Sequence, residues 1–124
     1  MAMQPADLHD RVQAGINAGD VEALVALYEP DAVFLNEDGP PAVGTEAIRE
    51  AFEALVAFGG TIALETRYAV ECGELAMMSN QYTFSMPGYE ATWISSEVAR
   101  RQPDGTWKYV LDNPYAAPVG ENSP

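Results

Sequence analysis

The stretch INAGDVEALVALYEPDAVFLNEDG, residues Ile16–Gly39, decides the fold of this chain. Within it, Gly19 tolerates the positive φ that commonly ends a helix, and Asp20 is a good N-cap for a second helix. Pro30 disfavours helix at the residue before it, so this second helix is expected to end there. The run DAVFLN, residues 31–36, then predicts a short strand in front of a cluster of turn residues.

Two further amphipathic helices flank this stretch. Leu8, Val12 and Ile16 recur every four residues and predict a helix over about residues 6–18. Thr45 is expected to cap a third helix, which continues through an apolar stripe that contains Ile48, Phe52, Leu55 and Val56.

The second half of the chain changes to the alternating pattern of β-strands. Strands are expected over residues 61–71, 75–86, 91–101 and 106–113, with turns between them. Helices followed by antiparallel strands predict an α+β fold, with the helices packed on one face of a curved sheet. Such a sheet could enclose a cavity for a ligand. The tail, residues 116–124, is rich in Pro, Gly and polar residues and is expected to fray.

Length, charge and composition narrow the class of protein. The 124 residues predict a single domain over 1–124, and a net charge of −13 disfavours binding to nucleic acid or to an anionic membrane. No apolar run is long enough for a membrane helix and no signal peptide is visible, so a cytoplasmic protein is expected. With one cysteine, Cys72, and one histidine, no disulfide framework, metal site or cofactor is expected. The surplus of acids serves solubility or steers a cationic ligand or partner.

The quoted stretch, together with VGTEAIREAF at residues 43–52, resembles the nuclear-transport-factor-2-like (NTF2-like) superfamily, especially its SnoaL-like and ketosteroid-isomerase-like branch. The ending DGTWKYVLDNPY, residues 104–115, resembles the last hairpin of the same group, so the likeness covers about residues 7–115. It implies a cone-shaped fold of three N-terminal helices on a strongly curved, mostly antiparallel mixed sheet, usually dimeric through the outer sheet face. The superfamily includes isomerases, dehydratases, cyclases, hydrolases and binding modules, so the resemblance is specific for fold and not for chemistry.

The resemblance to ketosteroid isomerase places Asn36 at the position of the carboxylate base of that enzyme. Val12 falls at the position of its tyrosine, and its remaining acid falls near Glu97. An amide does not take up and return a proton at neutral pH, so no steroid Δ-isomerase activity is expected. Asn36 is expected either to hydrogen-bond a ligand or to satisfy the backbone of the following turn.

Asp112, in the run VLDNPY, is the candidate catalytic residue. Strict alternation puts it on the same strand face as Lys108 and Val110. A carboxyl group so close to apolar residues could have a raised pKa and act as an acid or a base. The alternative is that it caps the turn before Pro114.

Four further residues are candidates for contact with a ligand. Asn80 interrupts an apolar strand face, so its amide needs a partner, which could be a ligand, a water molecule or a neighbouring side chain. Tyr28, Tyr82 and Trp93 could line a pocket, although large aromatic residues on strands are often simple core. His9 is expected to be a solvated histidine on the polar side of the first helix.

Three functions remain open at this point. The first is an enzyme, an isomerase, dehydratase or hydrolase, that acts on a small apolar organic ligand by acid–base chemistry. The second is a non-catalytic module that binds such a ligand or a protein, and the third is a domain that only dimerises. A cavity with a buried carboxyl group favours the first, a cavity with only amides and aromatic residues the second, and a filled cone the third. A homodimer is expected, because Ile94 and Val98 lie on the strand face opposite the helices.

Overall fold

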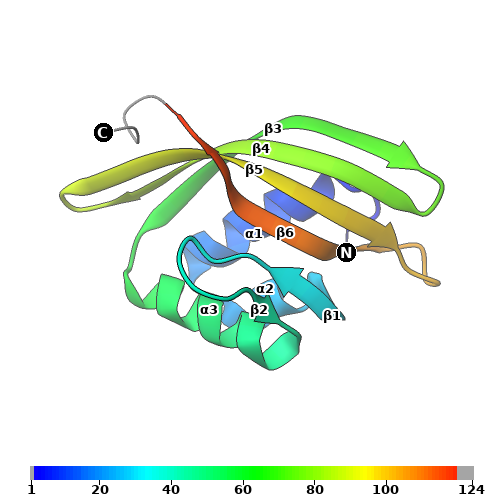
Figure 1. The fold of residues 1–124 in the computed structure, drawn as a ribbon, viewed down its shortest axis with the longest axis horizontal. Helices are drawn as coiled ribbons and strands as arrows, with labels where there is room; N and C mark the ends of the chain where they lie inside the picture. The colour runs from blue at the N-terminus through cyan, green and yellow to red at the C-terminus, as the bar shows by residue number, and fades with distance from the viewer. Residues whose placement is uncertain (1, 120–124) are drawn as a thin grey trace.

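The computed structural model describes residues 2–119 and shows three helices packed on one side of a six-stranded sheet (Figure 1). The helices are α1 (Asp7–Ala18), α2 (Val21–Val25) and α3 (Thr45–Ala57). The strands are β1 (Tyr28–Phe34), β2 (Ala42–Val43), β3 (Thr61–Cys72), β4 (Leu75–Met86), β5 (Tyr89–Arg101) and β6 (Trp107–Pro118). The predicted α+β fold is confirmed.

The sheet is mixed and mostly antiparallel. Its strand order is β2-β1-β6-β5-β4-β3, and only the pair β1–β6 is parallel. The register shifts within β3–β4, and twice within β5–β6. Such irregularities increase twist and bend a sheet, so they help to curve it around the helices. The three long hairpins join β3 to β6 in chain order, as the alternating pattern predicted.

The helix termini follow the expected chemistry, with two corrections. Gly19 ends α1 at a φ of 68°, and the Asp20 side chain accepts a hydrogen bond of 3.1 Å from the Ala23 backbone N–H at the start of α2. The second helix was predicted to reach the residue before Pro30, but it ends at Val25. Tyr28 already pairs with Tyr109 of β6, so the first strand begins three residues earlier than expected.

The third helix and the C-terminal tail differ slightly from expectation. Gly44 is the N-cap of α3, so Thr45 is its first helical residue and not its cap. Strand β6 continues to Pro118 because Ala117 and Pro118 pair with β5, so the chain remains regular past the point where fraying was expected. The rest of the expected frayed tail, residues 120–124, lies outside the described residues.

The core lies between the helices and the sheet. α1, α2 and α3 contribute Leu8, Ile16, Leu24, Ile48 and Phe52, and the sheet contributes Tyr28, Met78, Ala99, Trp107 and Tyr109. At one end of this layer the side chains do not fill the space, and a cavity remains.

Candidate functional site

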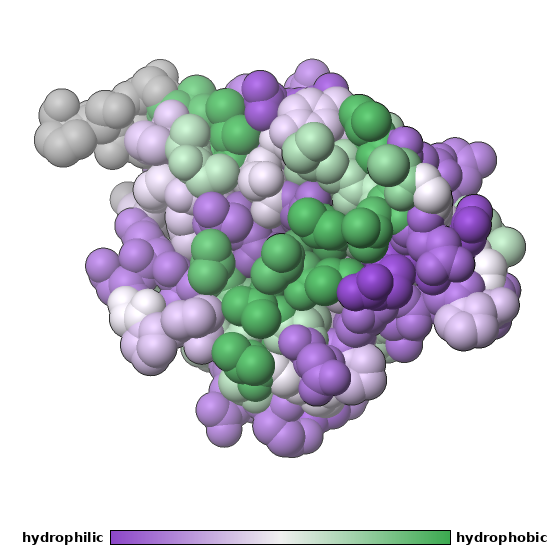
Figure 2. All heavy atoms as spheres, turned by 45° about the vertical axis from the view of Figure 1, so that its right-hand side comes forward, coloured by the Kyte–Doolittle hydropathy of each residue, from purple (hydrophilic) through white to green (hydrophobic). Residues whose placement is uncertain are grey.

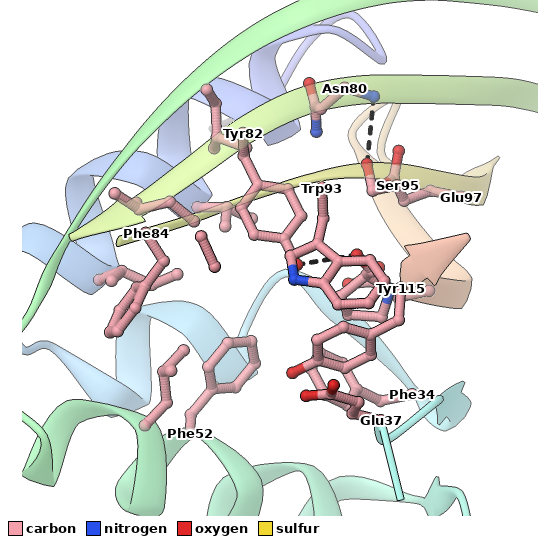
Figure 3. Close-up of a pocket in the computed structure, with 18 of the residues that line it drawn as sticks. Phe34, Glu37, Phe52, Asn80, Tyr82, Phe84, Trp93, Ser95, Glu97 and Tyr115 are labelled. Carbon is pink, nitrogen blue, oxygen red and sulfur yellow. Dashed lines mark hydrogen bonds between the residues drawn. The ribbon is translucent and has the colours of Figure 1, made fainter. Parts of the chain in front are cut away.

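A cavity of about 490 Å³ lies between the helices and the inner face of the sheet. Its walls are mostly apolar and aromatic, and they include Val12, Phe34, Phe52, Leu64, Phe84, Trp93 and Pro114 (Figure 3). Phe58 and Tyr89, which also line it, are more than half exposed and mark its open end. Polar lining groups include Asn80, Ser95, Glu97 and Asp112, all of them buried. A large apolar pocket with a few converging polar groups is the usual form of a small-molecule site.

Asp112 faces this cavity because of an irregularity in β6. Strict alternation would have put it on the face of Lys108, but the register of β6 against β5 shifts between Tyr109 and Leu111. A one-residue shift moves the following side chains to the other face of the sheet. Leu111 therefore points outward, and Asp112 joins Tyr109 on the buried face with 8% of its surface exposed.

The Asp112 carboxyl group is held by a tyrosine. The Tyr28 hydroxyl donates to Asp112 Oδ2 over 2.5 Å, a link between β1 and β6. Burial and the negative charge of Glu97 raise the pKa of Asp112 to about 8, although the hydrogen bond from Tyr28 opposes this rise. Burial and the neighbouring Asp112 charge raise the pKa of Tyr28 well above its ordinary value, so its hydroxyl keeps its proton. The raised pKa makes Asp112 the candidate for a proton-exchanging carboxyl group in this cavity.

Glu97 is the second buried acid of the site. It is the register partner of Asp112 on the neighbouring strand β5, so the two side chains lie side by side on the inner face. Glu97 Oε1 lies 3.1 Å from Nε2 of His9, and Nδ1 of the same ring lies 2.9 Å from Thr66 Oγ1. The predicted surface position of His9 is wrong: the residue is 1% exposed, because it extends from α1 to the inner face of the sheet and finds Glu97 there.

The three candidate residues on β4 and β5 all line the cavity. The Tyr82 hydroxyl donates to the backbone carbonyl of Pro114 over 2.8 Å, and the Trp93 ring packs edge-on against Tyr115, with centroids 5.3 Å apart. The Asn80 backbone N–H donates to Ser95 Oγ over 3.1 Å, at the end of the cavity where Glu97 lies (Figure 3). Among the described residues, the buried side-chain oxygen Oδ1 of Asn80 has no hydrogen-bond partner.

Asn36 does not join these residues. It is exposed, it does not line the cavity, and its amide donates to the Pro40 backbone carbonyl over 2.8 Å. The expectation of a ligand contact at Asn36 is therefore corrected in favour of the turn-backbone alternative. The strand β1 ends at Phe34, two residues earlier than expected, so Asn36 belongs to the turn.

Sequence reasoning missed the group that holds Asp112. Val12 does line the cavity on α1, where the resemblance places the tyrosine of ketosteroid isomerase, but Tyr28 on β1 supplies a hydroxyl to the site instead. Glu97 alternates with Trp93 and Ser95 on β5, a signal that could have placed it in the cavity. His9 carries no comparable signal, since it lies beside the apolar stripe of α1 and not within it.

The described part of the chain contains no cluster of three or more side chains that could hold a metal ion. Among the same residues, no helix has the length and apolar character needed to cross a membrane.

Comparison with known proteins places the chain in a family. No curated protein matches it. Its fold resembles that of a ketosteroid isomerase-like protein from Erwinia carotovora atroseptica SCRI1043, with 20% identity, a TM-score of 0.74, and coverage of 86% of this chain and 88% of that one. It also resembles an NTF2-like protein from Streptomyces avermitilis that is provisionally named a dehydratase, with 19% identity, a TM-score of 0.78, and 94% of each chain covered.

A third solved structure, an NTF2-like protein of unknown function from Shewanella oneidensis MR-1, has 14% identity, a TM-score of 0.75, and coverage of 86% of this chain and 92% of that one. At such identities the three likenesses show the fold alone. The family model of the SnoaL-like domain matches residues 9–112, which is most of the chain. The chain therefore belongs to the family of SnoaL-like domains.

Proposed function

We propose that the cavity binds a small, largely apolar organic molecule and that Asp112 moves a proton on it. The observation that carries this proposal is the Asp112 carboxyl group itself, which is buried, lines the cavity and accepts the hydrogen bond from Tyr28. A general acid or base works best when its pKa lies near the working pH. The pKa of Asp112 is raised to about 8, which meets that condition.

Each residue around Asp112 has a physical role in such a reaction. Tyr28 fixes the orientation of the carboxyl group and stabilises its ionised form after the proton has left. The charge of Glu97 does the opposite and favours the protonated form of Asp112. His9, through its contact with Glu97, holds that second acid in place beneath the cavity. The apolar walls exclude water and give the ligand its contact area.

An isomerase or a dehydratase fits this arrangement: an isomerase takes a proton from one carbon and returns it to another, and a dehydratase takes a proton from carbon and gives one to the hydroxyl group that leaves as water. A steroid Δ-isomerase does not, since Asn36 is an amide outside the cavity and Val12 brings no hydroxyl group. Loss of a hydrogen-bond donor to a developing oxyanion typically costs about 2.7–4 kcal/mol of transition-state stabilisation. We therefore expect no efficient isomerisation of a Δ5-steroid by this chain.

The non-catalytic binding module is the second candidate. A cavity lined only by amides and aromatic residues would favour it, and Asn80, Tyr82 and Trp93 are residues of that kind. Burial of two adjacent acids costs free energy, and a buried carboxyl group with a raised pKa, such as Asp112, is typical of catalytic sites. They favour the enzyme over the binding module. A domain that only dimerises would need no cavity at all.

A homodimer through the outer sheet face is part of the proposal. Register partners across all six strands put one apolar side chain per strand in a row on that face, namely Val70, Met77, Val98, Leu111, Val33 and Val43. Val70, Met77, Leu111 and Val43 are each about half exposed or more. Figure 2 shows apolar side chains gathered in a band on one face of the molecule, with hydrophilic residues on either side. A contiguous apolar patch of this kind is typical of a protein interface.

The experiment has two steps. Native mass spectrometry of protein purified from its own host identifies any retained small molecule, and that molecule is then incubated with the protein in D₂O. Proton transfer at carbon predicts that deuterium enters the molecule, that Asp112→Asn abolishes this uptake, and that the exposed Glu53→Gln leaves it unchanged. Binding of the ligand without deuterium uptake or turnover would support the binding module instead.

A further inference from the structure

Carboxyl groups are the acidic groups of the cavity wall, and no basic side chain among the described residues accompanies them there. Within the described chain the lining contains three acids, Glu37, Glu97 and Asp112, and no Lys, Arg or His. Glu37 is exposed and lies beside Tyr115, while Glu97 and Asp112 are buried (Figure 3). The whole chain, at −13, adds a field of the same sign. An anionic ligand would be repelled at every step of entry, whereas a cation would be attracted.

Each of the two buried acids has one carboxyl oxygen without a hydrogen bond to the described residues. Tyr28 donates to Oδ2 of Asp112, and His9 lies against Oε1 of Glu97. Within the described part of the chain, Asp112 Oδ1 and Glu97 Oε2 take part in no hydrogen bond. Because Asp112 and Glu97 are register partners, these two oxygens belong to neighbouring side chains at the wall of one cavity. Two such acceptors suit a ligand group with more than one N–H donor.

A third acceptor lies on the adjacent strand. The side chain of Asn80 is 4% exposed and lines the cavity, and its Oδ1 lacks a donor among the described residues. A buried acceptor without a donor destabilises the fold, and a bound donor would remove that cost. Figure 3 shows the amide nitrogen nearer to the cavity than the oxygen, so a flip of about 180° about the two-fold amide torsion would bring the oxygen to a ligand.

Aromatic rings surround the same space. Tyr28, Phe34, Phe52, Tyr82, Phe84, Trp93, Tyr109 and Tyr115 all line the cavity. The faces of such rings attract organic cations, most strongly where the contact is shielded from water. Aromatic walls that carry carboxyl groups suit a molecule with an apolar body and a positively charged head.

We propose that the ligand of this cavity is an organic amine, bound as an ammonium ion by Asp112 and Glu97 with its apolar body among the aromatic rings. This inference rests on the proposed function, and it adds the chemical class of the ligand to it.

The test compares three probes that share one apolar body: 2-(naphthalen-1-yl)ethylammonium, 2-(naphthalen-1-yl)ethanol and (naphthalen-1-yl)acetate. Calorimetry of the full chain at pH 9, where Asp112 is mostly ionised and the amine is still an ammonium ion, is expected to show that the ammonium binds about tenfold more tightly than the alcohol, and the acetate most weakly. Asp112→Asn and Glu97→Gln should each bring the ratio between ammonium and alcohol close to one. Glu53→Gln, which removes an exposed acid from α3, is the matched control and should leave the ratio unchanged.

The possible outcomes separate the two proposals. If the alcohol binds as tightly as the ammonium, the inference of an amine is wrong while a small-molecule cavity remains. If Glu53→Gln lowers the ratio as much as Asp112→Asn does, general surface charge and not the cavity selects the cation, and the inference is again wrong. If none of the probes binds to a folded protein, both proposals fail. The ratio is measured within each variant, so a modest loss of stability does not obscure it.

Discussion

The raised pKa of Asp112 lowers the free energy of unfolding as pH rises, and this effect can be measured. In the folded chain, burial and Glu97 raise the pKa of Asp112 to about 8, although the hydrogen bond from Tyr28 lowers it. An Asp in the unfolded chain has a pKa of about 3.9. Between these values the folded state binds more protons than the unfolded state, so the free energy of unfolding falls as pH rises from about 4 to about 8.

Chemical denaturation at several pH values is the corresponding measurement. Asp112 alone contributes a decline of at most about 1.4 kcal/mol per pH unit in this window. Asp112→Asn should make the profile shallower between pH 5 and pH 8. A profile with the same slope in both proteins would show that Asp112 has an ordinary pKa.

For single residues, the sequence predicted which side chains belong to the site better than it predicted the face to which each side chain points. Tyr28, Asn80, Tyr82, Trp93 and Asp112 all reach one cavity. Asp112 faces inward only because β6 shifts its register after Tyr109, and a single sequence does not reveal where a strand will bulge. The burial of His9 likewise depends on the strands that pack over it, and the periodicity of a helix does not reveal such tertiary contacts.

Helix α1 is tied to the sheet by a polar contact in an otherwise apolar layer. His9 of α1 meets Glu97 of β5 and Thr66 of β3, and His9 and Glu97 are both almost fully buried. Removal of one partner leaves the other buried without compensation, so His9→Leu is expected to lower the free energy of unfolding by about 2–4 kcal/mol. Replacement of both partners by apolar residues is often nearly neutral.

A double-mutant cycle measured by urea denaturation tests this contact. His9→Leu combined with Glu97→Leu should cost less than the sum of the two single changes. Strict additivity would mean that the two side chains do not interact in solution.

The three helices and the five longer strands followed from sequence patterns, whereas the short strand β2 and several element ends did not. Alternation and turn residues located the strands of the second half, and Asp20 marked the start of α2. Pro30 suggested a second helix that continues to the residue before it, but pairing of Tyr28 with β6 outweighs the helical preference of this segment. Short segments between a helix and a strand are decided by such tertiary contacts.

For the molecule as a whole, the apolar row across the outer sheet face predicts self-association. Leu111 lies within the row and is 47% exposed, so Leu111→Lys would place a charge in the middle of the proposed interface. Sedimentation at micromolar concentration should show a species of twice 13.4 kDa for the natural chain and a monomer for Leu111→Lys.

Met3→Lys is the matched control for this experiment, since Met3 is 59% exposed and lies outside the row. It should leave the dimer intact. A natural chain that sediments as a monomer would rule out the proposed interface.

The claim that Asp112 is a proton-exchanging carboxyl group is tested most directly by NMR titration of its side-chain carboxyl carbon. A midpoint near pH 8 is expected, with a still higher midpoint in Tyr28→Phe, where the hydrogen bond that lowers this pKa is lost. Exposed acids such as Glu53 should titrate close to the ordinary pKa of about 4.3 for a Glu in the same spectra. An Asp112 midpoint below about pH 5 would contradict the account, because the group would then be permanently ionised at neutral pH and poorly suited to return a proton.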